Sequence, residues 1–131
     1  MEKTKICIEH PLASKSMTIV WGLVGSASGL QKWLADYVTE NGDELVFTWG
    51  EPWTQREQKV AHVLDRVKNK HLRIRWDSYE EHEYLELRIE KSELTGLLSL
   101  LITDFAEPED EDYIRDLWDK NLRRLHHVSG I

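Results

Sequence analysis

The sequence predicts an α+β domain in which a β-sheet is covered by one long C-terminal helix. The first observation behind this prediction is residues 110–130, where apolar side chains recur at helical spacing. The second is the alternation of apolar and polar residues in two earlier runs, 71–77 and 83–90, which is typical of half-buried strands. An amphipathic helix of this length must bury its apolar stripe, and the alternating strands offer it a surface.

Composition limits the classes of function. The chain has 131 residues, 40% hydrophobic and 31% charged, so we expect a single folded domain over residues 1–131. The net charge of −7, with basic and acidic residues interleaved, argues against a nucleic-acid partner. We expect no membrane span and no signal peptide, because no apolar run approaches 18 residues. A single cysteine, Cys7, agrees with a cytoplasmic location.

The first third of the chain predicts a strand and two short helices. Residues 5–10 read as a strand that stops at Pro11. Ser14 or Ser16 can cap a first helix, which Gly25 ends, and a second helix is expected over residues 27–35. The apolar faces of the two helices consist of Met17, Val20, Trp21 and Val24 in the first and Leu30, Trp33 and Leu34 in the second.

The middle of the chain predicts strands and contains one ambiguous segment. Asn41-Gly42-Asp43 is a turn signal between two extended runs, the second over residues 44–50 with Leu45, Phe47 and Trp49 on one side. Residues 55–67 can be read in two ways. Val60, Val63, Leu64 and Val67 lie at helical spacing, whereas residues 59–63 also alternate acceptably as a strand. Periodicity alone slightly favours a helix.

The last half of the chain continues with three strands and the long helix. After a turn at residues 68–70, Leu72, Ile74 and Trp76 alternate with arginines, and Leu85, Leu87 and Ile89 alternate with charged residues. Residues 97–105 are more uniformly apolar, as expected of a strand near the sheet centre. The helix that follows is marked by Pro108 before it and Gly130 after it. Its stripe consists of Ile114, Leu117, Trp118, Asn121, Leu122, Leu125 and Val128.

The chemically reactive side chains predict no catalytic residue, metal site or cofactor. His126 and His127 project about 100° apart on one helix and suit the helix dipole better than a metal. We read Glu80-Glu81-His82-Glu83 as a solvated loop and Cys7 as a packed small side chain. Asp36 and Asp104 remain possible acid or base groups, but a single carboxylate is more often a cap or turn residue. A non-catalytic protein is therefore favoured over an enzyme.

Six segments of the chain resemble the sequence signatures of one known superfamily. Ser28-Gly29-Leu30-Gln31-Lys32-Trp33-Leu34 resembles its second-helix signature. Residues 60–64 followed by 72–76 resemble its paired strands, which end in a tryptophan. Residues 93–96, 100–105 and 117–118 are similar to small bacterial members. The superfamily that these segments resemble is the START-like superfamily, in the branch near activators of the heat-shock ATPase chaperone and polyketide cyclases. The resemblance implies that residues 55–64 form a strand, and it reverses the prediction from periodicity.

The implied architecture is the helix-grip fold. In this fold a curved antiparallel sheet, with two short helices after its first strand, wraps around the long C-terminal helix and usually leaves a hydrophobic cavity between them. Members include lipid carriers, cyclases and chaperone cofactors, so the fold alone does not assign an activity.

The function that we predict is non-catalytic binding of a small hydrophobic or lipid-like molecule between the sheet and the C-terminal helix. Core packing is the first interpretation of each tryptophan, but the same rings line a pocket if the helix does not press fully onto the sheet. Asn121 interrupts an apolar stripe and needs a backbone group, a water or a ligand. The alternatives are a protein-interaction module of the chaperone-cofactor kind and, third, a cyclase or hydrolase. The predicted ligand-binding residues are Phe47, Trp49, Ile74, Trp76, Leu87, Ile102, Leu117 and Asn121.

Overall fold

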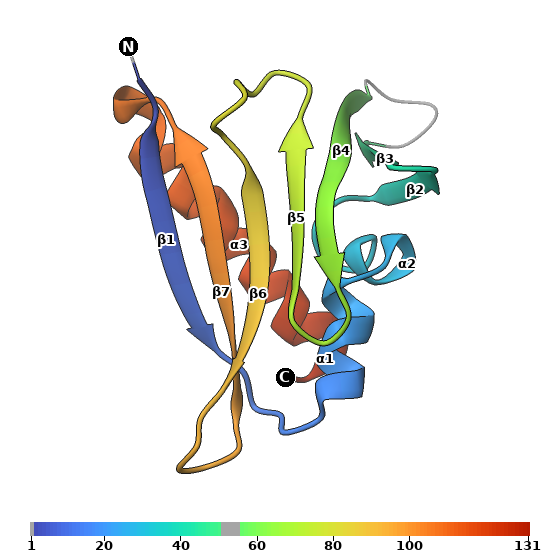
Figure 1. The fold of residues 1–131 in the computed structure, drawn as a ribbon, viewed down its shortest axis with the longest axis vertical. Coiled ribbons are helices and arrows are strands. Elements are labelled where there is room, and N and C mark those ends of the chain that lie inside the picture. Colours follow the sequence, from blue (N-terminus) through green and yellow to red (C-terminus); the bar gives the residue numbers. More distant parts are fainter. Residues whose placement is uncertain (1, 51–55) are drawn as a thin grey trace.

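The computed structural model describes residues 2–50 and 56–131, which form a curved antiparallel sheet with helices on its concave side (Figure 1). The described strands form one seven-stranded sheet in the order β1-β7-β6-β5-β4-β3-β2. The elements are β1 (Thr4–Pro11), α1 (Met17–Val24), α2 (Ala27–Leu30), β2 (Tyr37–Asn41), β3 (Glu44–Trp49), β4 (Glu57–Val67), β5 (His71–Trp76), β6 (Leu85–Lys91), β7 (Leu98–Ala106), a 3₁₀ turn (Pro108–Asp110) and α3 (Glu111–Ser129). The α+β fold with a long C-terminal helix, predicted from the sequence, is confirmed.

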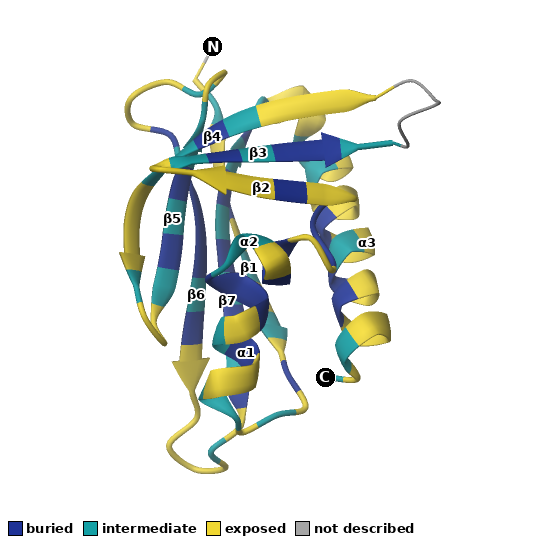
Figure 2. Ribbon diagram, turned by 90° about the vertical axis from the view of Figure 1, so that its right-hand side faces the viewer, coloured by how far each residue is buried: buried dark blue, intermediate teal, exposed yellow. Residues whose placement is uncertain are grey.

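The first and last strands of the chain lie side by side in the sheet. β1 pairs with β7 along its whole length, from Thr4 opposite Ala106 to Pro11 opposite Ser99. The sheet bends so that β2, β3 and β4 cross above α1 and α2, and α3 runs along the same side (Figure 2). Three helices on one concave face give the domain a single buried core.

The N-terminal helices begin where serine side chains cap them. Ser16 accepts a hydrogen bond from the backbone N–H of Ile19, and Ser26 accepts one from Gly29. α1 and α2 then approach so closely that a Cβ built on Gly29 would lie 1.9 Å from the carbonyl oxygen of Gly22. Only glycine fits at this crossing.

The second helix is shorter than predicted. α2 ends at Leu30, and residues 31–34 are turns rather than a continuation to residue 35. The side chains of this segment bond outside the helix instead. The Trp33 indole N–H donates to the Leu23 carbonyl at 2.9 Å, and Gln31 accepts from the Val38 N–H at 3.0 Å. These tertiary contacts override the helical spacing of the apolar residues.

The ambiguous segment is a strand, so the prediction from periodicity was wrong and the one from resemblance was right over residues 57–64. β4 runs on to Val67 and pairs with β3 and β5, while Gln55 lies outside the described residues. A bulge between Val63 and Asp65 shifts the register and leaves Leu64 exposed. Ala61, and not the helically spaced Val60, is the fully buried residue of this strand.

The C-terminal helix has the ends that the sequence predicts. The 3₁₀ turn over Pro108–Asp110 precedes it, and Gly130 ends it in the left-handed conformation with φ of 76°. Trp118, Leu122 and Leu125 are buried, whereas Leu117 is 36% and Val128 47% exposed. The predicted stripe is therefore only partly covered.

Two side chains have a different environment from the one expected. Cys7 is exposed on the outer face of β1, because Ile6 takes the inward position of the strand, so the packed interpretation was wrong. Glu83 is only 2% exposed, so the loop over residues 80–83 is not fully solvated. Its carboxylate is paired with Lys3 at 3.1 Å, which compensates for its burial.

Candidate ligand-binding site

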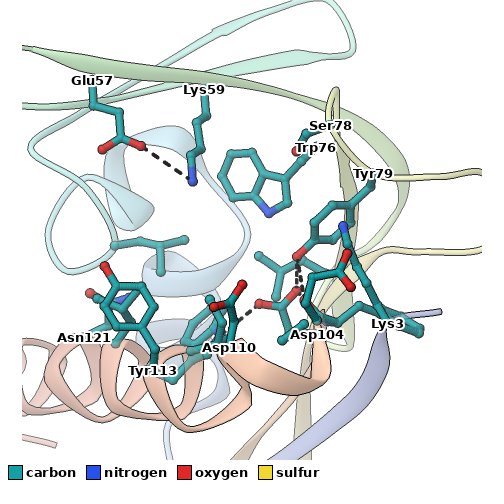
Figure 3. A pocket seen from close by; sticks show the side chains of 18 of the residues that line it. Lys3, Glu57, Lys59, Trp76, Ser78, Tyr79, Asp104, Asp110, Tyr113 and Asn121 are labelled. Carbon is teal, nitrogen blue, oxygen red and sulfur yellow. Dashed lines mark hydrogen bonds and ion pairs between the residues drawn. The ribbon is translucent and has the colours of Figure 1, made fainter. Parts of the chain in front are cut away.

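A pocket of about 510 Å³ lies between the first half of α3 and the sheet (Figure 3). The sheet side is formed by the ends of β3, β4, β5, β6 and β7, and the opposite side by residues 110–121 around the start of α3. The volume is within the range of small-molecule sites in proteins. The pocket is where the predicted binding site between sheet and helix was expected.

Aromatic rings form the wall on the sheet side. Trp49 and Trp76 line the pocket with ring centroids 6.5 Å apart, and both pack against Phe47, which lies behind them. The Trp49 indole N–H is held by the Leu34 carbonyl at 3.1 Å. Each ring lies on the same face of its strand as the buried residues two and four positions before it, so the backbone fixes its direction. The two rings are inclined by 45° and form a concave apolar wall.

The helix side combines apolar and amide groups. Ile114, Leu117 and Asn121 lie on successive turns of α3 and face the pocket, with Tyr113 beside them. Asn121 is half-buried, and its side chain has no hydrogen-bond partner among the described residues. A half-buried amide without a protein partner is available to a ligand or to water.

A buried carboxylate closes the inner end of the pocket. Asp104 on β7 is only 6% exposed and accepts hydrogen bonds from the Tyr79 hydroxyl at 2.5 Å, the Phe105 N–H at 2.8 Å and the Trp118 indole N–H at 3.0 Å. Burial raises the pKa of Asp104, although the hydrogen bonds from Tyr79 and Trp118 oppose this shift. Burial and the neighbouring Asp104 carboxylate raise the pKa of Tyr79. The hydroxyl of Tyr79 is thus a hydrogen-bond donor at neutral pH.

Two ammonium groups at the pocket are each paired with a carboxylate. Lys3 pairs with Glu83, and Lys59 lies 3.6 Å from Glu57. Each ammonium also lies over an aromatic ring, Lys3 at 4.2 Å from the Tyr79 centroid and Lys59 at 5.8 Å from the Trp49 centroid. Burial alone would raise the pKa of Glu83, but the hydrogen bonds from the Glu80 N–H and Lys3 outweigh it and lower that pKa.

Half of the predicted ligand-binding residues line this pocket. Trp49, Trp76, Leu117 and Asn121 do so. The other four, Phe47, Ile74, Leu87 and Ile102, are at most 1% exposed and belong to the packed core rather than to the lining. They share a face with the lining residues, but they lie deeper in the sheet.

The sequence-based list of site residues missed several groups that line the pocket. On α3 these are Tyr113, Ile114 and Trp118, of which the last two were identified in the helical stripe. Asp104 was considered only as a possible acid or base. Glu57 and Lys59 were missed because charged residues at the inward positions of a strand give no apolar alternation. Lys3 and Tyr79 enter from a terminus and a loop, where periodicity carries no signal.

The described part of the chain contains no group of three or more histidine, cysteine, aspartate or glutamate side chains placed to hold a metal ion. In the same residues, no helix is long and apolar enough to cross a membrane.

Comparison with known proteins identifies the family. The family model of the START-like superfamily domain matches residues 1–131. This chain belongs to the START-like superfamily. No curated protein matches it.

Solved structures share this START-like fold. BfR322 from Bacteroides fragilis, known from solution NMR, is 32% identical, with a TM-score of 0.65 over 98% of this chain and 92% of that one. The Aha1 dimer from Colwellia psychrerythraea is 13% identical, with a TM-score of 0.73 over 98% and 97%. DynU16, from the dynemicin biosynthetic locus, is 12% identical, with a TM-score of 0.72 over 99% of this chain and 48% of that one. The last two likenesses concern the fold alone.

Proposed function

We propose that this START-like domain binds a small hydrophobic or lipid-like molecule, without catalysing a reaction, in the pocket between α3 and the sheet. The observation that carries the proposal is the pocket of about 510 Å³ with Trp49 and Trp76 on one wall and Ile114 and Leu117 on the other. Ligand sites combine such apolar walls with a few placed polar groups. Asn121 and Tyr79 supply polar groups here.

The arrangement of Asp104 favours binding over catalysis. Both of its carboxylate oxygens already accept hydrogen bonds from protein donors. An acid–base pair needs two groups that exchange protons near neutral pH, and among the described lining residues the titratable side chain hydrogen-bonded to Asp104 is Tyr79, whose pKa is raised. Asp104 therefore positions Tyr79 and Trp118 in this proposal.

A neutral fluorescent probe tests the proposal. Nile red should bind the native protein at neutral pH with saturable one-to-one stoichiometry and quench tryptophan emission. Trp76→Ala should weaken binding by about tenfold or more, because the variant loses one face of the site. Trp21→Ala is the matched control, since Trp21 is a half-buried tryptophan of α1 that does not line the pocket. Equal losses in the two variants, or binding only to acid-expanded protein, would refute the proposal.

The ligand itself can be sought by native mass spectrometry of protein purified from its own host. Asn121→Leu then tests whether the amide contacts the bound molecule. The variant should be as stable as the parent or more so, because it replaces an unpaired amide by an apolar side chain, and it should retain less of the co-purified ligand. Retention equal to that of the parent would remove Asn121 from the site.

A protein-interaction module is the second candidate, and it rests on two observations. The fold is shared with a protein whose structure is that of an Aha1 dimer. In addition, the tip of the β6–β7 hairpin exposes Leu94 almost completely, at 97%, and Leu97 at 41%. Under this reading, Leu94→Ser should abolish a self-association or partner complex and leave Nile red binding unchanged.

A cytoplasmic location is also proposed, and the free thiol of Cys7 agrees with it.

A further inference from the structure

The pocket is lined by more acidic than basic side chains among the described residues. Among the described lining residues, Glu57, Asp104, Glu107 and Asp110 are acidic, and Lys3 and Lys59 are basic. Both lysines are already paired with carboxylates. A molecule that enters the pocket therefore lies near more carboxylates without an ion-pair partner than ammonium groups without one.

Three of these carboxylates have no ion-pair partner within the described residues, namely Asp104, Glu107 and Asp110. The oxygens of Asp104 instead accept hydrogen bonds from protein donors. Asp110 is placed where it could cap α3, yet its side chain makes no capping hydrogen bond. Figure 3 shows Asp110 near the start of α3, on the same side of the pocket as Asp104 and below Trp76. The carboxylate of Asp110 thus makes no hydrogen bond or ion pair with the described residues.

The protein's own ammonium groups indicate what the aromatic wall accepts. Lys59 reaches into the pocket from β4 and lies over Trp49 beside Glu57, and Lys3 lies over Tyr79 beside Glu83. In both places a cation sits between a ring face and a carboxylate, which is the arrangement that recognises organic cations. Trp76 and Asp110 offer a ring and a carboxylate to which no lysine of the described chain is bound.

We propose that the ligand of this pocket is an organic cation, with an apolar body that lies against Trp49 and Trp76 and a protonated amine that faces Asp110 and Glu107. This inference rests on the proposed function and adds a charge to the ligand class. It disfavours fatty acids and other carboxylates, because an anion would lie beside Glu107 and Asp110, whose charges are not paired with an ammonium group of the described residues.

Three probes with the same ring system and different charges test whether the pocket prefers a cation, separately from whether it binds an apolar molecule at all. Naphthylethylamine, naphthylethanol and naphthylacetate are respectively cationic, neutral and anionic at neutral pH. By calorimetry at low salt, the amine should bind at least about tenfold more tightly than the alcohol, and the carboxylate more weakly than both. The preference for the amine should shrink at about 1 M salt, where charges are screened.

Single substitutions test the residues. Asp110→Asn and Glu107→Gln should each lower amine affinity by about two- to tenfold and lower alcohol affinity by less, because the neutral alcohol loses no charge–charge attraction. Asp116→Asn is the matched control, since it removes the same charge from the exposed face of α3, outside the lining. Lys59→Met should raise amine affinity, because it frees the Trp49 ring and the Glu57 carboxylate.

The possible failures are distinguishable. If the alcohol or the carboxylate binds as tightly as the amine at low salt, the cation inference is wrong and the pocket remains a binding site. If none of the three probes and no Nile red binds, the proposed function is wrong as well. Equal effects of Asp110→Asn and Asp116→Asn on the amine would also overturn the inference, because the preference would then come only from the overall charge.

Discussion

The substitution Asp104→Ala removes the acceptor on which three donors of the pocket's inner end converge. Tyr79 retains a second acceptor, the Phe105 carbonyl at 3.2 Å, and so loses little. The Trp118 indole N–H and the Phe105 N–H have no second acceptor among the described residues. Trp118 is 5% exposed, so water cannot easily replace the lost carboxylate.

The expected loss of stability follows from these contacts. Leaving a buried donor unsatisfied costs about 1–3 kcal/mol, and removing a buried carboxylate whose pKa is raised by burial offsets part of this. We therefore expect Asp104→Ala to lower the free energy of unfolding by about 1–3 kcal/mol at neutral pH. This is a large share of the stability of a small domain.

A double-mutant cycle isolates the contact between Asp104 and Trp118. Urea unfolding is followed by far-ultraviolet circular dichroism for Asp104→Ala, Trp118→Phe and the double variant. The coupling energy should be about 1.5–3 kcal/mol, as for other hydrogen bonds to charged groups. The control cycle uses Trp49→Phe, because that indole N–H donates to the Leu34 carbonyl and the ring packs on Phe47 and Trp76 instead, so its effect should be additive with Asp104→Ala. Additivity of Asp104 and Trp118 within about 0.5 kcal/mol would refute the reasoning.

Two further predictions concern the frame around the site. Gly29→Ala should lower the melting temperature by an amount equivalent to about 1–3 kcal/mol, since its Cβ would meet the Gly22 carbonyl at 1.9 Å. Gly22→Ala is the control, and it should leave the melting temperature unchanged or raise it, because nothing lies within 4 Å of its Cβ. A loss in both variants would contradict this. Glu83→Gln should destabilise the protein at neutral pH. The folded protein lowers the pKa of Glu83, so the ionised carboxylate stabilises the fold at pH values above its ordinary pKa of about 4.3. The difference in stability between the variant and the parent should vanish as the pH falls through the lowered pKa. Thermal melts across the acid range check it, and a difference that grows in acid would be inconsistent with the Lys3 pairing.

The parts of the fold that the sequence predicts are those with local signals. α3 begins after Pro108 and ends at Gly130, since a proline and a left-handed glycine mark the ends whatever surrounds the helix. The turn at Gly42, with φ of 63°, is equally local. β4 is not predicted by its local signal. Four of its apolar residues lie at helical spacing, but hydrogen bonding to β3 and β5 makes the segment a strand.

The site is harder to predict than the fold, because exposure along a strand depends on the curvature of the sheet. Phe47 and Trp49 lie on the same face of β3, yet Phe47 is fully buried and Trp49 borders the pocket. Ile74 and Trp76 on β5 differ in the same way. Alternation gives the face, and only the position of α3 decides which residues of that face remain uncovered.

The distribution of charge along β4 accounts for where the pocket opens. The inward positions of this strand carry Ala61 in the core, and then Lys59 and Glu57 toward its beginning. An ammonium and a carboxylate cannot be packed dry under a helix without a large desolvation cost, so α3 cannot close onto the sheet there. At the other end of the helix the facing groups are apolar, and Leu122 and Leu125 are buried. The inward charges on β4 thus oppose complete collapse of the core and keep the tryptophan wall accessible.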